Sequence, residues 1–99
     1  MPYSKTWEIM QKSYDWIMSQ ICHAKQNGEN TISFSFEEWH QAVAADVEPY
    51  VWDRAVAYAD DPLRRILSHK LNCARLHISH SGSRFSTPIG EHRWTIRAI

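Results

Sequence analysis

Basic side chains are concentrated in the second part of this chain, and cations gathered on one surface bind polyanions. Residues 62–99 contain seven Lys and Arg side chains and one acidic residue, Glu91, whereas residues 1–61 contain four basic and ten acidic ones. This asymmetry in a neutral chain favours two surfaces with different partners, the basic one being a candidate for a polyanion. The alternative is that the two parts attract each other within the fold. The seven cations are Arg64, Arg65, Lys70, Arg75, Arg84, Arg93 and Arg97.

Zinc binding and catalysis are the other chemistries to consider. Cys73, His77, His80 and His92 are residue types that zinc accepts. Side chains alternate along a strand, however, so His77 and His80 are expected on opposite faces, as exposed hairpin residues. The two cysteines are expected to be reduced, mostly buried thiols. No nucleophile-elbow, metalloprotease, P-loop or dinucleotide-binding pattern is present. We therefore expect no metal, no cofactor and no catalytic residue.

A long helix over residues 4–26 is the first element expected to position the rest. Ser4 supplies an N-cap and Gly28 a stop after the helix. Apolar side chains recur between them at steps of three and four residues, and Trp16 and Met18 widen the stripe. The residues of the stripe are Trp7, Met10, Tyr14, Ile17 and Ile21.

A short strand and a second helix follow. The segment "NTISFSF", residues 30–36, alternates apolar and hydroxyl side chains, as a half-buried strand does. Ser35 and Glu38 have the spacing of a capping box, so a helix is expected to begin there and to end near Asp46. Its inward side chains are expected to be Trp39, Ala42 and Val43.

Two more helices are expected, over residues 49–59 and 62–72. Pro49 and Pro62 suit first helical positions, and Asp61 is the N-cap of the later helix. The inward stripe of that helix consists of Leu63, Ile66, Leu67 and Leu71. The side chains expected on its outer face are Arg64, Arg65, Ser68, His69 and Asn72, with Lys70 near their margin.

The rest of the chain predicts β-structure. "ARLHISH" and "HRWTIRAI" both alternate apolar and polar side chains, and the segment between them is rich in turn residues. The strands could pair as an antiparallel hairpin with a long tip, or as a three-stranded meander with residues 84–87 in the middle. Either arrangement gives a single α+β domain over residues 1–99.

This order of elements resembles the winged-helix variant of the helix-turn-helix fold, over residues 5–98. The resemblance implies that the short strand joins the C-terminal hairpin and that an exposed helix before the hairpin binds double-stranded DNA. Helices 49–59 and 62–72 are both candidates for that exposed helix.

The resemblance also assigns residues to the DNA interface. On helix 62–72 it implies major-groove contacts by Arg64, Arg65, Ser68, His69 and Asn72, of which the two arginines and Asn72 suit base edges. Lys70 and Arg75 would contact phosphate. Arg84 on the hairpin would hold the DNA backbone, with Ser81 and Ser83 as neutral donors.

A homodimer would double the number of phosphate contacts and explain the wide apolar stripe of the first helix. The residues expected at such a contact are Trp7, Met10, Tyr14, Trp16 and Ile17. The expected function is that of a small cytoplasmic regulator of transcription or replication that recognises inverted repeats. No apolar segment has the length of a signal peptide core or a membrane span, so no membrane partner is expected.

Protein–protein binding is the alternative function. Small, Trp-rich proteins without catalytic motifs include phage and mobile-element products that inhibit a host enzyme or a CRISPR complex. In that case the acidic part of the chain would occupy the nucleic-acid channel of a host protein or nucleoprotein complex. The carboxylates concerned are Glu37, Glu38, Asp46, Glu48 and Asp53.

Overall fold

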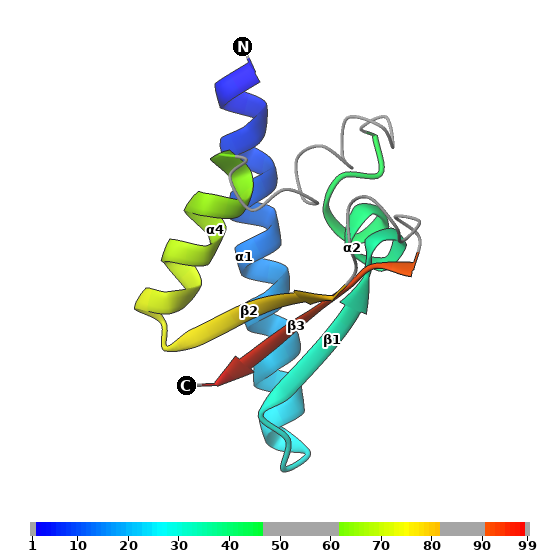
Figure 1. Cartoon of the computed structure of the whole chain (residues 1–99), viewed down its shortest axis with the longest axis vertical. Coiled ribbons are helices and arrows are strands. Elements are labelled where there is room, and N and C mark those ends of the chain that lie inside the picture. The colour runs from blue at the N-terminus through cyan, green and yellow to red at the C-terminus, as the bar shows by residue number, and fades with distance from the viewer. Residues whose placement is uncertain (1, 47–61, 82–90, 99) are drawn as a thin grey trace.

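The computed structural model describes residues 2–46, 62–81 and 91–98, which form an α+β fold. Figure 1 shows its elements in chain order: α1 (Pro2–Gln26), β1 (Thr31–Ser35), α2 (Phe36–Val43), α4 (Pro62–Cys73), β2 (Leu76–Ser81) and β3 (Arg93–Ala98). The helix expected over residues 49–59 and the hairpin residues Ser83 and Arg84 lie outside the described residues. None of the described helices combines the length and the apolar composition that crossing a bilayer requires.

The first helix starts earlier than expected and stops where expected. Helix α1 begins at Pro2, so Ser4 is inside the helix and is not its N-cap. At the other end, Gly28 has a positive φ of 79°. Its N–H donates to the Lys25 carbonyl at 3.1 Å, and the Glu29 N–H donates to the Ala24 carbonyl at 2.9 Å. This pair of bonds is a Schellman motif, which confirms the glycine stop.

The capping box between β1 and α2 is confirmed. The Ser35 hydroxyl accepts from the Glu38 N–H at 3.2 Å, while the Glu38 carboxylate accepts from the Ser35 N–H at 3.1 Å. Of the three side chains expected to face inward, Trp39 and Val43 are buried and Ala42 is exposed. The reason is that α2 turns Phe36, Trp39, His40 and Val43 toward the core, and Ala42 stands outside this stripe.

The three strands form one antiparallel sheet in the order β1-β3-β2. Phe34 of β1 stands opposite Trp94, and Ile78 of β2 stands opposite Ile96, so the last strand in the chain is the central one. The expectation that the short strand joins the C-terminal hairpin is confirmed. The residues that distinguish a plain hairpin from a meander lie outside the described part of the chain.

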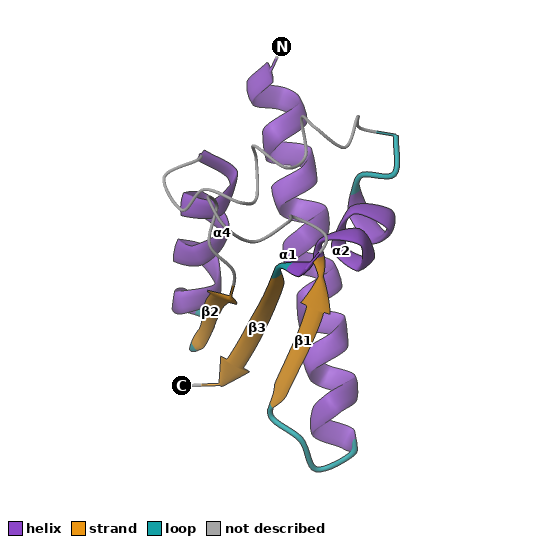
Figure 2. Ribbon diagram, turned by 45° about the vertical axis from the view of Figure 1, so that its right-hand side comes forward, coloured by secondary structure: helices purple, strands orange, loops and turns teal. Residues whose placement is uncertain are grey.

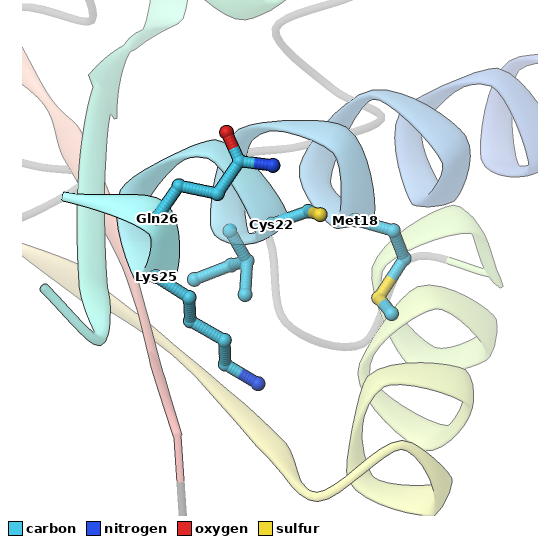
Figure 3. A pocket seen from close by; sticks show the side chains of 5 residues that line it. Met18, Cys22, Lys25 and Gln26 are labelled. Atoms are coloured by element: carbon cyan, nitrogen blue, oxygen red, sulfur yellow. The ribbon is translucent and has the colours of Figure 1, made fainter. Parts of the chain in front are cut away.

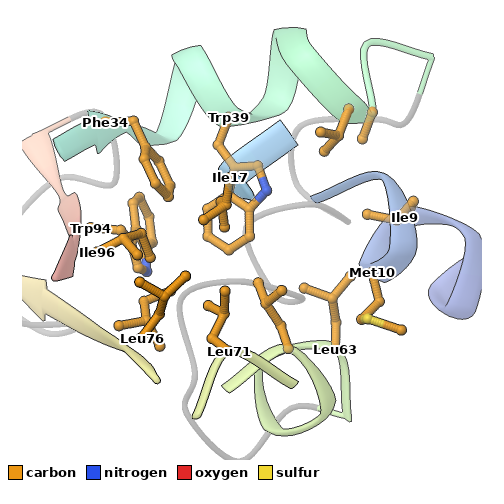
Figure 4. Packing of buried hydrophobic residues seen from close by; sticks show 14 of the residues in the cluster. Ile9, Met10, Ile17, Phe34, Trp39, Leu63, Leu71, Leu76, Trp94 and Ile96 are labelled. Atoms are coloured by element: carbon orange, nitrogen blue, oxygen red, sulfur yellow. The ribbon is translucent and has the colours of Figure 1, made fainter. Parts of the chain in front are cut away.

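One face of this sheet packs on the helices, and none of the described helices covers the other face, on which most side chains are exposed. Figure 2 shows α1 crossing behind the strands. Aromatic rings join the layers: Phe34 and Trp39 meet edge to face at 5.3 Å, and so do Trp39 and Trp94. The Trp39 indole N–H also donates to the buried hydroxyl of Ser13 at 2.8 Å, which ties α2 to α1. Figure 4 shows this core, to which α4 contributes Leu63, Leu67 and Leu71.

Candidate nucleic-acid interface

Helix α4 has an apolar inner side and a polar outer side, as expected. Leu63, Leu67 and Leu71 are at most 1% exposed. Arg65, His69 and Asn72 are exposed, Ser68 is half-buried, and the helix contains no acidic residue. Residues four and three positions apart share one side of a helix, so these three exposed side chains form a continuous stripe.

Arg64 does not belong to that outer side, so the expectation that it lies on the outer face of the helix is wrong. It is only 6% exposed, and this burial lowers the pKa of its guanidinium. The physical reason is helical geometry, because Arg64 stands three residues before Leu67 and seven before Leu71 and so lies on the buried stripe. Residue type alone had placed it outside.

Lys70 also faces its own chain. The side chain is half-buried, and its ammonium donates to Gln11 Oε1 at 2.7 Å and lies 4.5 Å from the centroid of the Tyr14 ring. These contacts hold α4 to α1 and turn the charge away from the stripe. Arg75 is exposed, with a φ of 61°, at the turn between α4 and β2.

His80, expected to be an exposed hairpin residue, is half-buried against a second histidine. His92 is 1% exposed, and its Nδ1 lies 2.6 Å from Nε2 of the half-buried His80. The His80 ring stacks on Trp94, with centroids 4.7 Å apart and planes 3° from parallel. Burial, with the charges of His92 and Arg64, lowers the pKa of His80 to about 4.

Alternation along the strands explains this packing. His80 continues the inward series of Leu76 and Ile78, and His92 precedes Trp94 on the inward side of the central strand. The same alternation leaves His77 exposed, on the face opposite His80, as expected. Among the described residues, no three His, Cys, Asp or Glu side chains gather in a way that could hold a metal ion.

Both cysteines are exposed free thiols, so the expectation that they are mostly buried is wrong. Cys73 ends α4, where its sulfur lies 3.8 Å from Nε2 of His69. Cys22 lines a surface hollow beside α1, shown in Figure 3. All the residues lining this hollow come from the last turns of that one helix. They are Met18, Ile21, Cys22, Lys25 and Gln26.

The stripe of α1 that was expected to bind a second copy is largely used within the chain. Met10 and Ile17 are fully buried in the core of their own domain, so this fold leaves neither of them exposed to a second copy. They are buried because this side of α1 packs inside the core, where Met10 lies beside Leu63 of α4 (Figure 4). Trp16 and Tyr14 are half-buried, and Trp16 meets Phe34 edge to face at 4.9 Å. Trp7 differs from them, because it is 57% exposed.

No family model matches this chain, and no curated protein or solved structure shows significant similarity to it.

Proposed function

We propose that this protein binds double-stranded DNA through the exposed stripe of α4. The observation that carries the proposal is the stripe itself: Arg65, His69 and Asn72 lie side by side on a helix without a carboxylate, and the helix is held rigidly by its leucines. Arginine donates two hydrogen bonds to guanine, and asparagine forms two with adenine, so the stripe suits base edges in a major groove.

The dimensions agree with this role. Arg65 and Asn72 are seven residues apart, which is about 10 Å along a helix rising 1.5 Å per residue. Successive base pairs are about 3.4 Å apart, so one α4 helix would contact roughly three of them. A site that short is too common to regulate one gene. A winged-helix regulator that acts as a dimer on an inverted repeat would double the length of the site. Among the described residues expected at the contact between copies, Trp7 is the most exposed.

The inhibitor alternative has less support from the described residues. Glu48 and Asp53 lie outside them. Glu38 is engaged in the capping box, and its carboxylate also lies 3.9 Å from the Arg93 guanidinium. Glu37 and Asp46 are exposed on α2 and just after it. The exposed stripe of α4 therefore supports DNA binding better than these carboxylates support the binding of a host protein's nucleic-acid channel.

The test is a titration of labelled double-stranded DNA of mixed sequence at about 50 and 200 mM salt, where phosphate contacts are strong and then screened. The variant Arg65→Ala/Asn72→Ala is compared with Lys12→Ala/Gln20→Ala, which removes the same charge from the exposed side of α1. We expect salt-sensitive binding that the α4 variant weakens and the α1 variant preserves. Equal affinities for the two folded variants would contradict the role of α4.

A further inference from the structure

The open face of the sheet is a second basic surface, which the α4 proposal does not use. Each residue of β3 that points outward stands between two outward residues of the neighbouring strands. Arg93 lies between Ser35 and Ser81, Thr95 between Ser33 and Ser79, and Arg97 between Thr31 and His77. We call these nine residues the outer sheet face. Figure 2 shows the strands in front of α1, with this face turned away from the helix.

The outer sheet face contains only a few types of side chain. It holds two arginines, one histidine and six hydroxyl side chains, with no carboxylate and no apolar ring. Seven of the nine residues are exposed, while Ser35 and Thr95 are half-buried. Both arginines of the central strand are exposed, and Arg93 stands between two short hydroxyl side chains.

Hydrogen bonds fix part of this face. The Nε of Arg93 donates to the Ser33 hydroxyl at 3.1 Å, so its guanidinium leans over β1. One of its terminal nitrogens lies 3.9 Å from the Glu38 carboxylate, and both side chains are at least half exposed. An exposed pair at that distance is weak, so an incoming anion can replace Glu38.

This composition selects one class of partner. Single-stranded nucleic acid is typically bound by Phe, Tyr or Trp rings on which successive bases stack, and the outer sheet face contains none of these three residue types. Tight protein interfaces depend on buried aromatic or aliphatic anchors, which are also missing from it. Arginine and hydroxyl side chains are instead the usual donors to phosphate oxygens of duplex DNA. Arg93 and Arg97 are four residues apart, about 13 Å at 3.3 Å per residue, which is close to the width of a major groove.

We propose that the outer sheet face binds the phosphate backbone of double-stranded DNA, without regard to base sequence. The proposal takes its ligand class from the proposed function, but it does not depend on contacts by α4. It makes Arg93 and Arg97 the phosphate-binding residues, the hydroxyls secondary donors, and Glu38 a carboxylate that competes with DNA for Arg93.

The experiment measures the affinity for mixed-sequence duplex DNA, and its salt dependence, for Arg93→Gln/Arg97→Gln and the charge-matched control Lys12→Gln/Lys25→Gln on α1. Each phosphate contact contributes about 0.9 to the slope of log affinity against log salt, so we expect the sheet variant to lower that slope by roughly 2. Its affinity at low salt should fall about tenfold or more, equally for all sequences. Thermal unfolding of both variants verifies that they remain folded.

A third variant tests the competition by Glu38. Glu38→Gln removes the charge and keeps a side chain that can complete the capping box. We expect it to raise the affinity severalfold, because Arg93 loses its only described ion-pair partner. Unchanged affinity and slope in the sheet variant, with the protein folded, would overturn the proposal.

The outcomes separate this surface from α4. Weaker binding by the sheet variant together with normal binding by Arg65→Ala/Asn72→Ala would support the outer sheet face and contradict the α4 proposal. The reverse result would contradict the outer sheet face alone. Vesicles containing phosphatidylserine serve as a second probe: if the two arginines were required for vesicle binding and not for DNA binding, the phosphate partner would be a lipid and the proposal would fail.

Discussion

His80 and His92 share one hydrogen bond inside the domain, with Nε2 of the first 2.6 Å from Nδ1 of the second. At that distance one nitrogen carries a proton and the other accepts it, so the two rings cannot both be imidazolium without two N–H groups facing each other. Arg64, buried nearby, adds its positive charge, and His80 is stacked on Trp94. The native fold therefore favours the neutral form of His80, whose pKa is lowered to about 4.

Acid should destabilise the protein before its carboxylates are protonated. The pKa of His80 is about 4 in the fold, whereas an unperturbed histidine has a pKa of about 6.5. The unfolded chain therefore binds this proton first, and native stability is lost as the pH falls from about 6.5 to 4. We expect a loss of about 1 kcal/mol, since solvent screens the half-exposed ring. Urea unfolding followed at several pH values measures it.

His80→Gln is the matched variant for this pH effect, because glutamine can still hydrogen bond but does not titrate. Its free energy of unfolding should vary less between pH 6.5 and 4 than that of the wild type. A pH profile that stays parallel to the wild-type profile would show that another group is responsible.

Arg64 should be important for stability and not for DNA contact. Arg64→Ala removes a long side chain from the core and should lower the free energy of unfolding by about 1–3 kcal/mol. Arg64→Met keeps most of the volume without the charge, so it should recover part of that loss. Chemical denaturation compares the three proteins. If Arg64→Ala were fully stable yet deficient in DNA binding, Arg64 would have to be exposed in solution.

The link between α1 and α2 through Ser13 should also be measurable. Ser13→Ala deletes the 2.8 Å bond from the Trp39 indole in a fully buried environment. We expect the free energy of unfolding to fall by about 1–2 kcal/mol. Ser19→Ala, at an exposed position of the same helix, is the control and should change it very little. Equal effects in the two variants would mean that the bond contributes nothing net.

Replacing Trp7 should weaken the proposed homodimer. An indole that is 57% exposed is the large apolar group that self-association would cover. We expect Trp7→Ser to shift the mass measured by sedimentation at tens of micromolar protein toward the monomer, on the premise that an aromatic anchor supplies much of the contact energy. Lys12→Ser is the control from the same helix. A monomeric wild type, or equal dimerisation of both variants, would remove Trp7 from this role.

Features set by neighbouring residues were predictable from the sequence, and those set by pairing across the fold were less so. The Ser35–Glu38 box, the stop at Gly28 and the strand alternation all depend on residues a few positions apart. The position of Arg64 in the helix also indicates that it is buried. At 100° per residue, Arg64 and Leu71 lie only about 20° apart around the helix axis. An arginine at such a position is an exception to the rule that charged side chains lie outside, and residue type and helical position therefore conflict there.

The histidine pair and the outer sheet face could not be predicted without knowing the register of the strands. Alternation separates His77 from His80, but exposed histidines were expected, and only the pairing of His80 with Trp94 brings His80 and His92 together. The outer sheet face likewise depends on β1 joining β3, which sets Ser33 beside Arg93 across sixty residues of sequence. Local patterns identify which residues of a strand share a face, and tertiary packing decides what stands beside them.

The central position of β3 has a consequence for how the protein is made. Among the described strands, β1 and β2 pair with β3 and not with each other. The ribosome adds β3 after both of them, so neither ladder can form while the chain is still growing toward residue 93. Until then Phe34 lacks its cross-strand partner Trp94, and Ile78 lacks its partner Ile96. The backbone edges of β1 and β2 that later pair with β3 are meanwhile free to pair with other chains. A nascent chain is thus most exposed to aggregation just before its central strand emerges.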